Sequence, residues 1–153
     1  MNKEDIYKGI LLQVKFLFNE ERDQTANLAN TVAIMKSTPL PFFWIGFYIV
    51  QDNELILGPF QGLPASSRIA YGKGVCGTAW KEEKTQIVPD VHQFPGHIAC
   101  NQFSRSEIVV PVFKNGKMVA VLDADSDKMA DFDETDAHFI EQITAVVGEN
   151  WNG

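Results

Sequence analysis

A short turn signal in the second half of the chain restricts the fold more than any other feature of the sequence. Asn115 and Gly116 lie between two apolar runs, residues 108–113 and 118–122. Asn-Gly in such a setting is the strongest short-range signal for a β-hairpin, because both residues tolerate the positive φ that a tight two-residue turn requires. The sequence therefore predicts an antiparallel strand pair, so any fold for this chain must contain a sheet built at least partly from hairpins.

Helical patterns stand at both ends of the chain. Apolar residues recur at helical spacing over residues 5–19 and again over residues 23–36, and Pro39 and Pro41 follow the second pattern and end it. A last helix is predicted to begin at Asp133, which is a good N-cap residue followed by an acidic first turn.

The segments between these helices predict further strands at residues 42–50, 54–57 and 86–88, with irregular stretches at 58–77 and 90–100. The visible connections are hairpins rather than crossovers through helices. We therefore expect an α+β fold, an antiparallel sheet with the N- and C-terminal helices packed on one face. With 153 residues and neither a linker nor a repeat, a single domain over residues 1–153 is expected.

Charge and cysteine content exclude several classes of protein. The chain carries 20 acidic and 13 basic side chains, a net charge of −7, which argues against binding a phosphate backbone. Its longest apolar run, residues 40–50, is shorter than the ~20 residues that a membrane helix needs, and no signal peptide is visible. We expect neither nucleic acid nor membrane as a partner. Two cysteines do not make a disulfide framework and fit a reducing, cytoplasmic setting.

Two aspartates interrupt the end of a predicted strand. Asp123 and Asp125 follow the apolar run 118–122, and their i, i+2 spacing places them on the same face of a sheet. Acids often begin turns, so this pair is explained equally well by the end of a strand or by a ligand site at which crowding raises the pKa values of both carboxyls.

Glu107 opens the partner strand, and its position depends on the register of the hairpin. A strict two-residue turn puts Glu107 opposite Ala124, on the wrong face, whereas one extra residue in either strand puts it opposite Asp125. Pro111 cannot donate a ladder hydrogen bond and so indicates an edge or a bulge. We therefore predict a bulge or a longer turn that groups the three acids.

The two cysteines and one aromatic segment are the other candidate site residues. Cys76 lies between Gly74 and Gly77, and Cys100 lies near a histidine, although a free cysteine taken alone is more often a small buried apolar residue. Trp44 and Tyr48 share one face of a predicted strand with Gly46 between them. Core packing explains these rings, and so does the wall of a small-molecule pocket with room left by the glycine.

Seven segments, in this order along the chain, match the motifs of a known family: WIGFY (44–48), LGPFQG (57–62), GKGVCGTA (72–79), DVH (90–92), FPGHIAC (94–100), SEIVVP (106–111) and VLD (121–123). Through them the chain resembles the GAF-domain free methionine-(R)-sulfoxide reductases over nearly its whole length. The segment that ends at Cys100 is specific to that family among GAF domains.

The resemblance implies a GAF fold, with a ligand pocket on the sheet face opposite the helices, and a role for each candidate. Cys100 is then the attacking cysteine and Cys76 the resolving one, Glu107, Asp123 and Asp125 are pocket acids, and Trp44 and Tyr48 form the aromatic wall. Among the acids, we assign Glu107 and Asp125 to catalysis as well as to substrate binding.

The implied reaction converts free L-methionine (R)-sulfoxide to L-methionine through a cysteine sulfenic acid. An intramolecular disulfide then forms, and thioredoxin or another dithiol reduces it. No metal or organic cofactor is expected, and a homodimer is left open. The alternative functions are a non-enzymatic GAF module that senses a small ligand, a general thiol peroxidase and a scaffold protein.

Three positions depart from the family pattern. Ser66 stands where the family often has a third cysteine, Asn101 where an acid is usual, and Ala124 lies between the two aspartates. Without a cysteine at position 66, Cys76 has to resolve the sulfenic acid alone.

Overall fold

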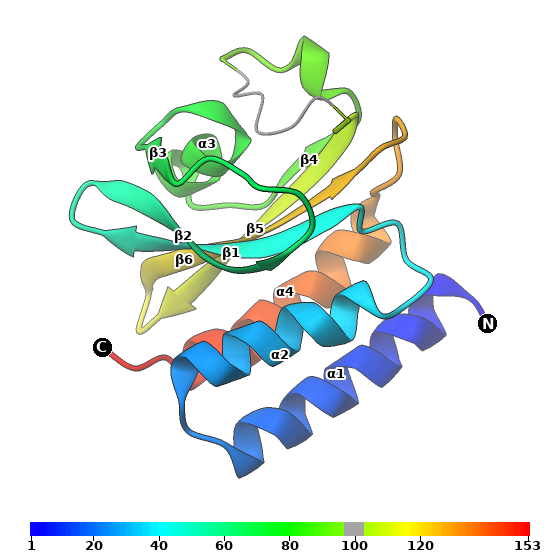
Figure 1. The fold of residues 1–153 in the computed structure, drawn as a ribbon, viewed down its shortest axis with the longest axis vertical. Coiled ribbons are helices and arrows are strands. Elements are labelled where there is room, and N and C mark those ends of the chain that lie inside the picture. The colour runs from blue at the N-terminus through cyan, green and yellow to red at the C-terminus, as the bar shows by residue number, and fades with distance from the viewer. Residues whose placement is uncertain (97–102) are drawn as a thin grey trace.

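The computed structural model describes residues 1–96 and 103–153 and contains a six-stranded antiparallel sheet with the strand order β3-β2-β1-β6-β5-β4. The helices α1, α2 and α4 cover one face of this sheet, and α3 lies on the other (Figure 1). The bounds of the elements are α1 Lys3–Glu20, α2 Gln24–Lys36, β1 Trp44–Gln51, β2 Glu54–Gln61, β3 Arg68–Ala70, α3 Gly74–Glu82, β4 Gln86–Val88, the 3-10 helix η1 Val91–Gln93, β5 Ser106–Lys114, β6 Lys117–Ser126 and α4 Glu134–Glu149.

The predicted terminal helices are present and are joined to each other by a buried polar contact. Asp133 caps α4 in a capping box with Asp136, as its position in the sequence indicated. The fully buried carboxylate of Asp136 also accepts hydrogen bonds from Tyr7 Oη at 2.6 Å and from Lys3 Nζ at 2.7 Å, both on α1. Burial, together with the negative charge of Asp136, raises the pKa of Tyr7. These hydrogen bonds therefore hold the N-terminal turn of α4 against the N-terminal part of α1.

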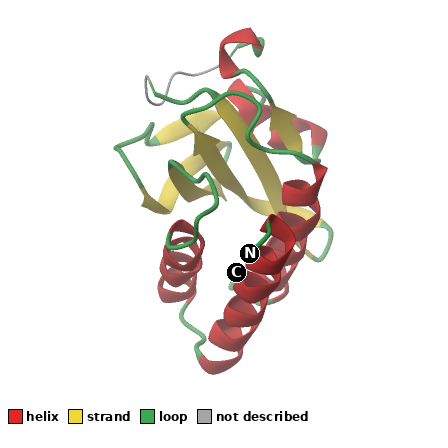
Figure 2. Ribbon diagram, turned by 90° about the vertical axis from the view of Figure 1, so that its right-hand side faces the viewer, coloured by secondary structure: helices red, strands yellow, loops and turns green. Residues whose placement is uncertain are grey.

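One face of the sheet and the three long helices enclose the main apolar core, and Figure 2 shows these helices gathered on one side of the strands. Side chains at alternate positions of β1, β5 and β6 point into this core, as expected for a sheet with two distinct faces. These strand residues are Ile45, Phe47, Ile108, Val110, Val112, Ala120, Leu122 and Ala124. The predicted arrangement, an antiparallel sheet with terminal helices on one face, is confirmed.

The hairpin between β5 and β6 contains the predicted irregularity. Lys114 pairs with Lys117 across the turn, but Val112 pairs with Ala120, which leaves Val119 as an extra residue of β6. From there to the end of the strands the register is shifted by one residue, and Glu107 pairs with Asp125. The bulge therefore brings Glu107 to the sheet face of the aspartates.

Residues 58–77, predicted to be irregular, contain regular structure. β2 continues to Gln61, β3 follows, and α3 begins within the glycine-rich segment. Gly74, the first residue of α3, has a φ of +62°, and no side chain caps this helix at its N-terminus. The helix therefore begins without the capping residue by which helix starts are recognised in a sequence.

None of the helices within the described parts of the chain is both long enough and apolar enough to span a membrane. The assignment of residues 1–153 to a single domain stays a prediction.

Two glycines in helices provide a test of the helix layer. A Cβ on Gly148 of α4 would lie 2.0 Å from the backbone oxygen of Phe113, whereas a Cβ on Gly9 of α1 would meet no atom within 4 Å. Alanine gains about 1 kcal/mol of helix propensity at either site, but overpacking costs about 1–3 kcal/mol. Because a backbone atom 2.0 Å away cannot yield without moving β5, the clash outweighs the gain at Gly148.

We expect Gly148→Ala to lower the free energy of unfolding by about 2 kcal/mol, and Gly9→Ala to raise it by about 0.5–1 kcal/mol. Urea denaturation followed by circular dichroism measures both. Equal effects of the two substitutions would show that α4 does not pack against β5 as closely as described.

Candidate active site

The register of the three central strands lines up three candidate residues across the sheet. Trp44 of β1 pairs with Asp125 of β6, and Asp125 pairs in turn with Glu107 of β5. One step along β1, Gly46 pairs with Asp123. Because positions i and i+2 of a strand share a face, Asp123, Asp125 and Glu107 point to the same side of the sheet, away from the three long helices.

Helix α3 covers this face and contributes Cys76 as its third residue. The helix lies close to the preceding chain because Gly77 has no side chain, and a Cβ there would lie 2.7 Å from the backbone oxygen of Ala70. Cys76 is 4% exposed and is one of the apolar residues packed between α3 and the sheet.

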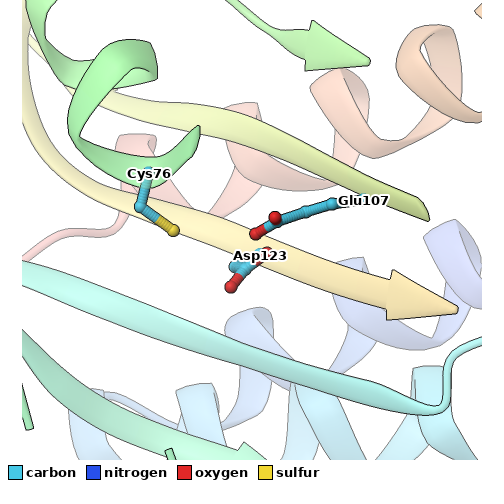
Figure 3. A group of neighbouring side chains, drawn as sticks. All are labelled: Cys76, Glu107 and Asp123. Atoms are coloured by element: carbon cyan, nitrogen blue, oxygen red, sulfur yellow. The ribbon is translucent and has the colours of Figure 1, made fainter. Parts of the chain in front are cut away.

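Cys76, Glu107 and Asp123 form a compact group, in which one ligand atom of each lies within 4.8 Å of the others (Figure 3). All three are buried, as is Asp125. A thiolate with two carboxylates is a donor set that can bind a divalent metal such as zinc, so these three residues are those that could hold an ion. The same group can also exchange protons with a bound molecule.

Burial is the largest influence on the carboxyls of this group. It raises the pKa of Asp123 above its ordinary value, against the hydrogen bonds that this carboxyl shares with Glu107 and Cys76. The pKa of Asp125 is raised further, first by burial and then by the negative charge of Asp123, although Glu107 and Ser104 hydrogen-bond to it. A hydrogen bond between two carboxyl groups needs a proton on one of them, so Glu107 and the aspartates hold protons jointly.

One carboxyl oxygen of Asp123 is a further feature of the site. Among the residues that the structure describes, no group donates a hydrogen bond to Asp123 Oδ1, although this atom is buried. A buried acceptor without a donor costs free energy, so native structures rarely keep one unless a ligand or water occupies the site. Asp123 therefore offers an acceptor to an N–H, O–H or ammonium group of a bound molecule.

The aromatic residues of β1 pack beside the acids. The ring of Trp44 lies over Gly46, where a Cβ would come within 2.6 Å of it, and its Nε1 donates to the backbone oxygen of Leu63 at 2.8 Å. Tyr48 Oη donates to the backbone oxygen of Ser66 at 2.8 Å. Both rings are buried and their centroids lie 6.2 Å apart. The room that Gly46 provides is taken by the Trp44 ring and by Phe60, so the expectation of free space between the two rings is wrong.

The structure brings Cys76, Glu107, Asp123, Asp125 and Trp44 together, with Tyr48 further along β1 on the same face. Cys100 and Asn101, together with His97, lie outside the described residues.

Ala124 and Ser104 differ in their position relative to the acids. Ala124 is buried in the core on the helix side of the sheet, so this departure from the family pattern does not face the acids. Ser104 was missed in the sequence, although it is buried and hydrogen-bonds to Asp125. No pattern around it distinguishes it from an ordinary loop serine.

Comparison with known proteins agrees with this arrangement of sheet and helices. The family model described as "GAF domain" matches residues 20–151, which defines the class of protein to which this fold belongs. GAF domain-containing protein A of Dictyostelium discoideum is 54% identical over 143 residues, which are 93% of this chain and 90% of that protein.

Two further similarities specify the family. The free methionine-R-sulfoxide reductase of Saccharomyces cerevisiae is 42% identical over 158 residues, covering 98% of this chain and 88% of that protein. The structure of free methionine-R-sulfoxide reductase from Neisseria meningitidis, in complex with its substrate, superposes with a TM-score of 0.95 at 45% identity, covering 98% of this chain and 90% of that one. The chain belongs to the GAF-domain family of free methionine-R-sulfoxide reductases.

The raised pKa values predict how stability changes with pH. A carboxyl whose pKa is higher in the folded than in the unfolded state binds more protons when folded, so it loses stability as the pH rises from about 4 through its folded pKa. Asparagine at position 125 does not ionise, so its substitution removes this loss of stability at higher pH.

We therefore expect the free energy of unfolding of Asp125→Asn, minus that of the unsubstituted chain, to grow as the pH rises above about 4 and then to level off. Urea denaturation at a series of pH values measures this difference. Asp127→Asn, at an exposed position two residues further on, is the matched control for the loss of a charge. A difference that does not change with pH would contradict the raised pKa of Asp125.

Proposed function

We propose that this protein reduces free L-methionine (R)-sulfoxide to L-methionine. The proposal rests on one observation, the buried group of Cys76, Glu107 and Asp123 with donor atoms within 4.8 Å of one another. It is supported by membership of a family that includes the named reductases of Saccharomyces cerevisiae and Escherichia coli. A thiol beside proton-holding carboxyls fits the chemistry of a sulfoxide, since the reaction needs both a sulfur nucleophile and a proton source.

The buried acids also fit the other groups of a free amino acid. Asp123 Oδ1 lacks a donor among the described residues, and the ammonium group of methionine sulfoxide can supply one. A methionine within a peptide chain has an amide in place of this ammonium, so ammonium binding selects the free amino acid. We assign the packing of the substrate's methyl group to Trp44 and Tyr48, whose buried rings lie on the same face of the sheet as the acids.

A carboxyl group of the buried acids supplies the proton that the sulfoxide oxygen needs. An oxide ion is a very poor leaving group, so the oxygen has to be protonated as its bond to sulfur breaks. A carboxyl whose pKa is raised by burial can hold a proton under conditions in which an exposed aspartate has lost it. We assign this proton to the group of Glu107 and Asp125, while Asp123 shares a hydrogen bond with Cys76.

The sulfur steps follow the family resemblance. The thiolate of Cys100 attacks the sulfoxide sulfur, the oxygen passes to Cys100 as a sulfenic acid, and methionine leaves. The thiol of Cys76 then attacks the sulfenic sulfur, an S–S bond forms between the two cysteines, and the oxygen leaves as water. Each turnover thus oxidises two thiols and reduces one sulfoxide.

A dithiol from outside has to close the cycle. With Ser66 in place of a third cysteine, Cys76 and Cys100 are the two cysteines of the chain and form one intramolecular disulfide. Thioredoxin reduces it by thiol–disulfide exchange, and dithiothreitol can take its place in a test tube. The proposed cycle needs no metal or organic cofactor and fits a reducing, cytoplasmic setting.

The activity is tested by supplying racemic free methionine sulfoxide with dithiothreitol and separating the epimers by chiral chromatography. We expect the R epimer to disappear, an equal amount of methionine to form, and the S epimer to remain. A protein that binds the sulfoxide but consumes neither epimer would instead be a ligand-sensing GAF module, and the proposal would be wrong.

The cysteine roles are tested by serine variants in the same assay, with thioredoxin in place of dithiothreitol. We expect Cys100→Ser to form no methionine, even in a single turnover, because the attacking sulfur is missing. Cys76→Ser should form one methionine per chain and then stop with thioredoxin as the reductant, because its sulfenic acid has no partner thiol. Thermal unfolding of both variants is the control for folding, and full cycling of Cys76→Ser with thioredoxin would exclude its role as the resolving cysteine.

A further inference from the structure

The buried group of Cys76, Glu107 and Asp123 has the composition of a metal site. A thiol from α3, a carboxyl from β5 and a carboxyl from β6 turn their donor atoms toward one another (Figure 3). These atoms lie within 4.8 Å of one another, and the three residues are 4%, 7% and 4% exposed. Donors around a tetrahedral zinc ion lie about 3–4 Å apart, because each bond is about 2.0–2.3 Å long. Small rotations of the three side chains therefore bring them onto one ion.

One oxygen of Asp123 independently favours a cation at this place. Asp123 Oδ1 is buried, and no group among the described residues donates a hydrogen bond to it. Such an acceptor is costly to bury, and a metal ion satisfies it by taking up its lone pair. The other two donors, Cys76 and Glu107, already contact this carboxyl through hydrogen bonds. A dication also offsets the negative charge that three ionised donors would gather in a buried position.

The sulfur atom of Cys76 decides which kind of ion fits. Magnesium and calcium take oxygen ligands alone, in six or more positions. Zinc accepts thiolate sulfur together with carboxylate oxygen, and needs only four ligands. Zinc sites with three protein ligands leave the fourth position to water or a small molecule. A thiol and two carboxyls therefore match zinc better than either of the other two ions.

We propose that Cys76, Glu107 and Asp123 of the reduced chain bind Zn²⁺, and that zinc and methionine sulfoxide exclude each other from this site. On binding, a Zn–S bond forms, the S–H bond of Cys76 breaks and its proton passes to water, and no atom changes its oxidation state. The exclusion rests on the proposed function, in which Cys76 resolves the sulfenic acid and Asp123 accepts from the substrate ammonium. Zinc occupies both groups at once, so it is a reversible inhibitor of the reductase and not its cofactor.

The metal site is tested on the reduced chain without substrate, by titration with Co²⁺. Cobalt takes the place of zinc, and its bond to a thiolate gives a charge-transfer band in the near ultraviolet. We expect this band at an equimolar amount of cobalt, and we expect added zinc to remove it. Cys76→Ser should lose the band, whereas Cys100→Ser is the matched control and should keep it. An unsubstituted chain without the band overturns the proposal, as does a Cys76→Ser variant that keeps it or a Cys100→Ser variant that loses it.

The carboxylate donors are tested by amide variants. Asp123→Asn and Glu107→Gln should each raise the dissociation constant for zinc by more than about tenfold, since even an outer-shell partner of a metal contributes about 10–100-fold. Competition with a chelating dye measures this constant, and circular dichroism checks the fold. Asp127→Asn, at an exposed position, is the matched control for the loss of a carboxylate. Amide variants that bind zinc as tightly as Asp127→Asn would contradict the three-donor site.

The exclusion of substrate is tested with Cys100→Ser, in which we expect no turnover. The R epimer of free methionine sulfoxide should raise the apparent dissociation constant for zinc. The S epimer chelates free zinc equally in solution, so it is the matched control and should raise this constant less. A chain that reduces the R epimer in the activity assay, but shows equal effects of both epimers on zinc, would contradict the exclusion. A chain that reduces neither epimer, yet gives the cobalt band that depends on Cys76, would contradict the proposed function and leave the zinc site standing.

Discussion

The register between β5 and β6 is the constraint on which the site depends. One extra residue, Val119, shifts the pairing so that Glu107 lies opposite Asp125 and not opposite Ala124. In the unshifted register the Glu107 side chain would point into the apolar core beneath the helices, where an unpaired charge is very costly. On its other side β6 pairs with β1, and this second register places Trp44 opposite Asp125 and Gly46 opposite Asp123.

The two faces of the sheet make opposite contributions to stability. On the helix side, apolar residues pack closely and the buried acid Asp136 accepts hydrogen bonds from Tyr7 and Lys3. On the other side, buried acids share protons, and Asp123 keeps an oxygen without a donor among the described residues. Such an arrangement is retained when a site needs it, and the helix face provides the stability that offsets its cost.

Much of the fold could be predicted from the sequence because its signals are local. The Asn115-Gly116 turn, the Asp133 cap and the apolar spacing in the terminal helices each act within a few residues. The bulge was predicted because the sheet had to bring Glu107 to the face of the aspartates, but Pro111 does not mark it. Pro111 lies beyond the end of β4, where β5 is an edge strand and a missing N–H costs little. Helix α3 and the contact between Ser104 and Asp125 depend on tertiary packing, which no local pattern records.

The central claim is that the buried carboxyls hold a proton where ordinary aspartates have lost theirs. NMR of the side-chain carboxyl carbons, recorded across pH with the Asp123→Asn and Asp125→Asn variants for assignment, measures this directly. We predict that the titration midpoint of the Asp125 signal lies well above that of an ordinary aspartate, and that this midpoint falls when Asp123 is replaced. An Asp125 carboxyl that titrates near pH 4, and does so equally well without Asp123, would contradict the account.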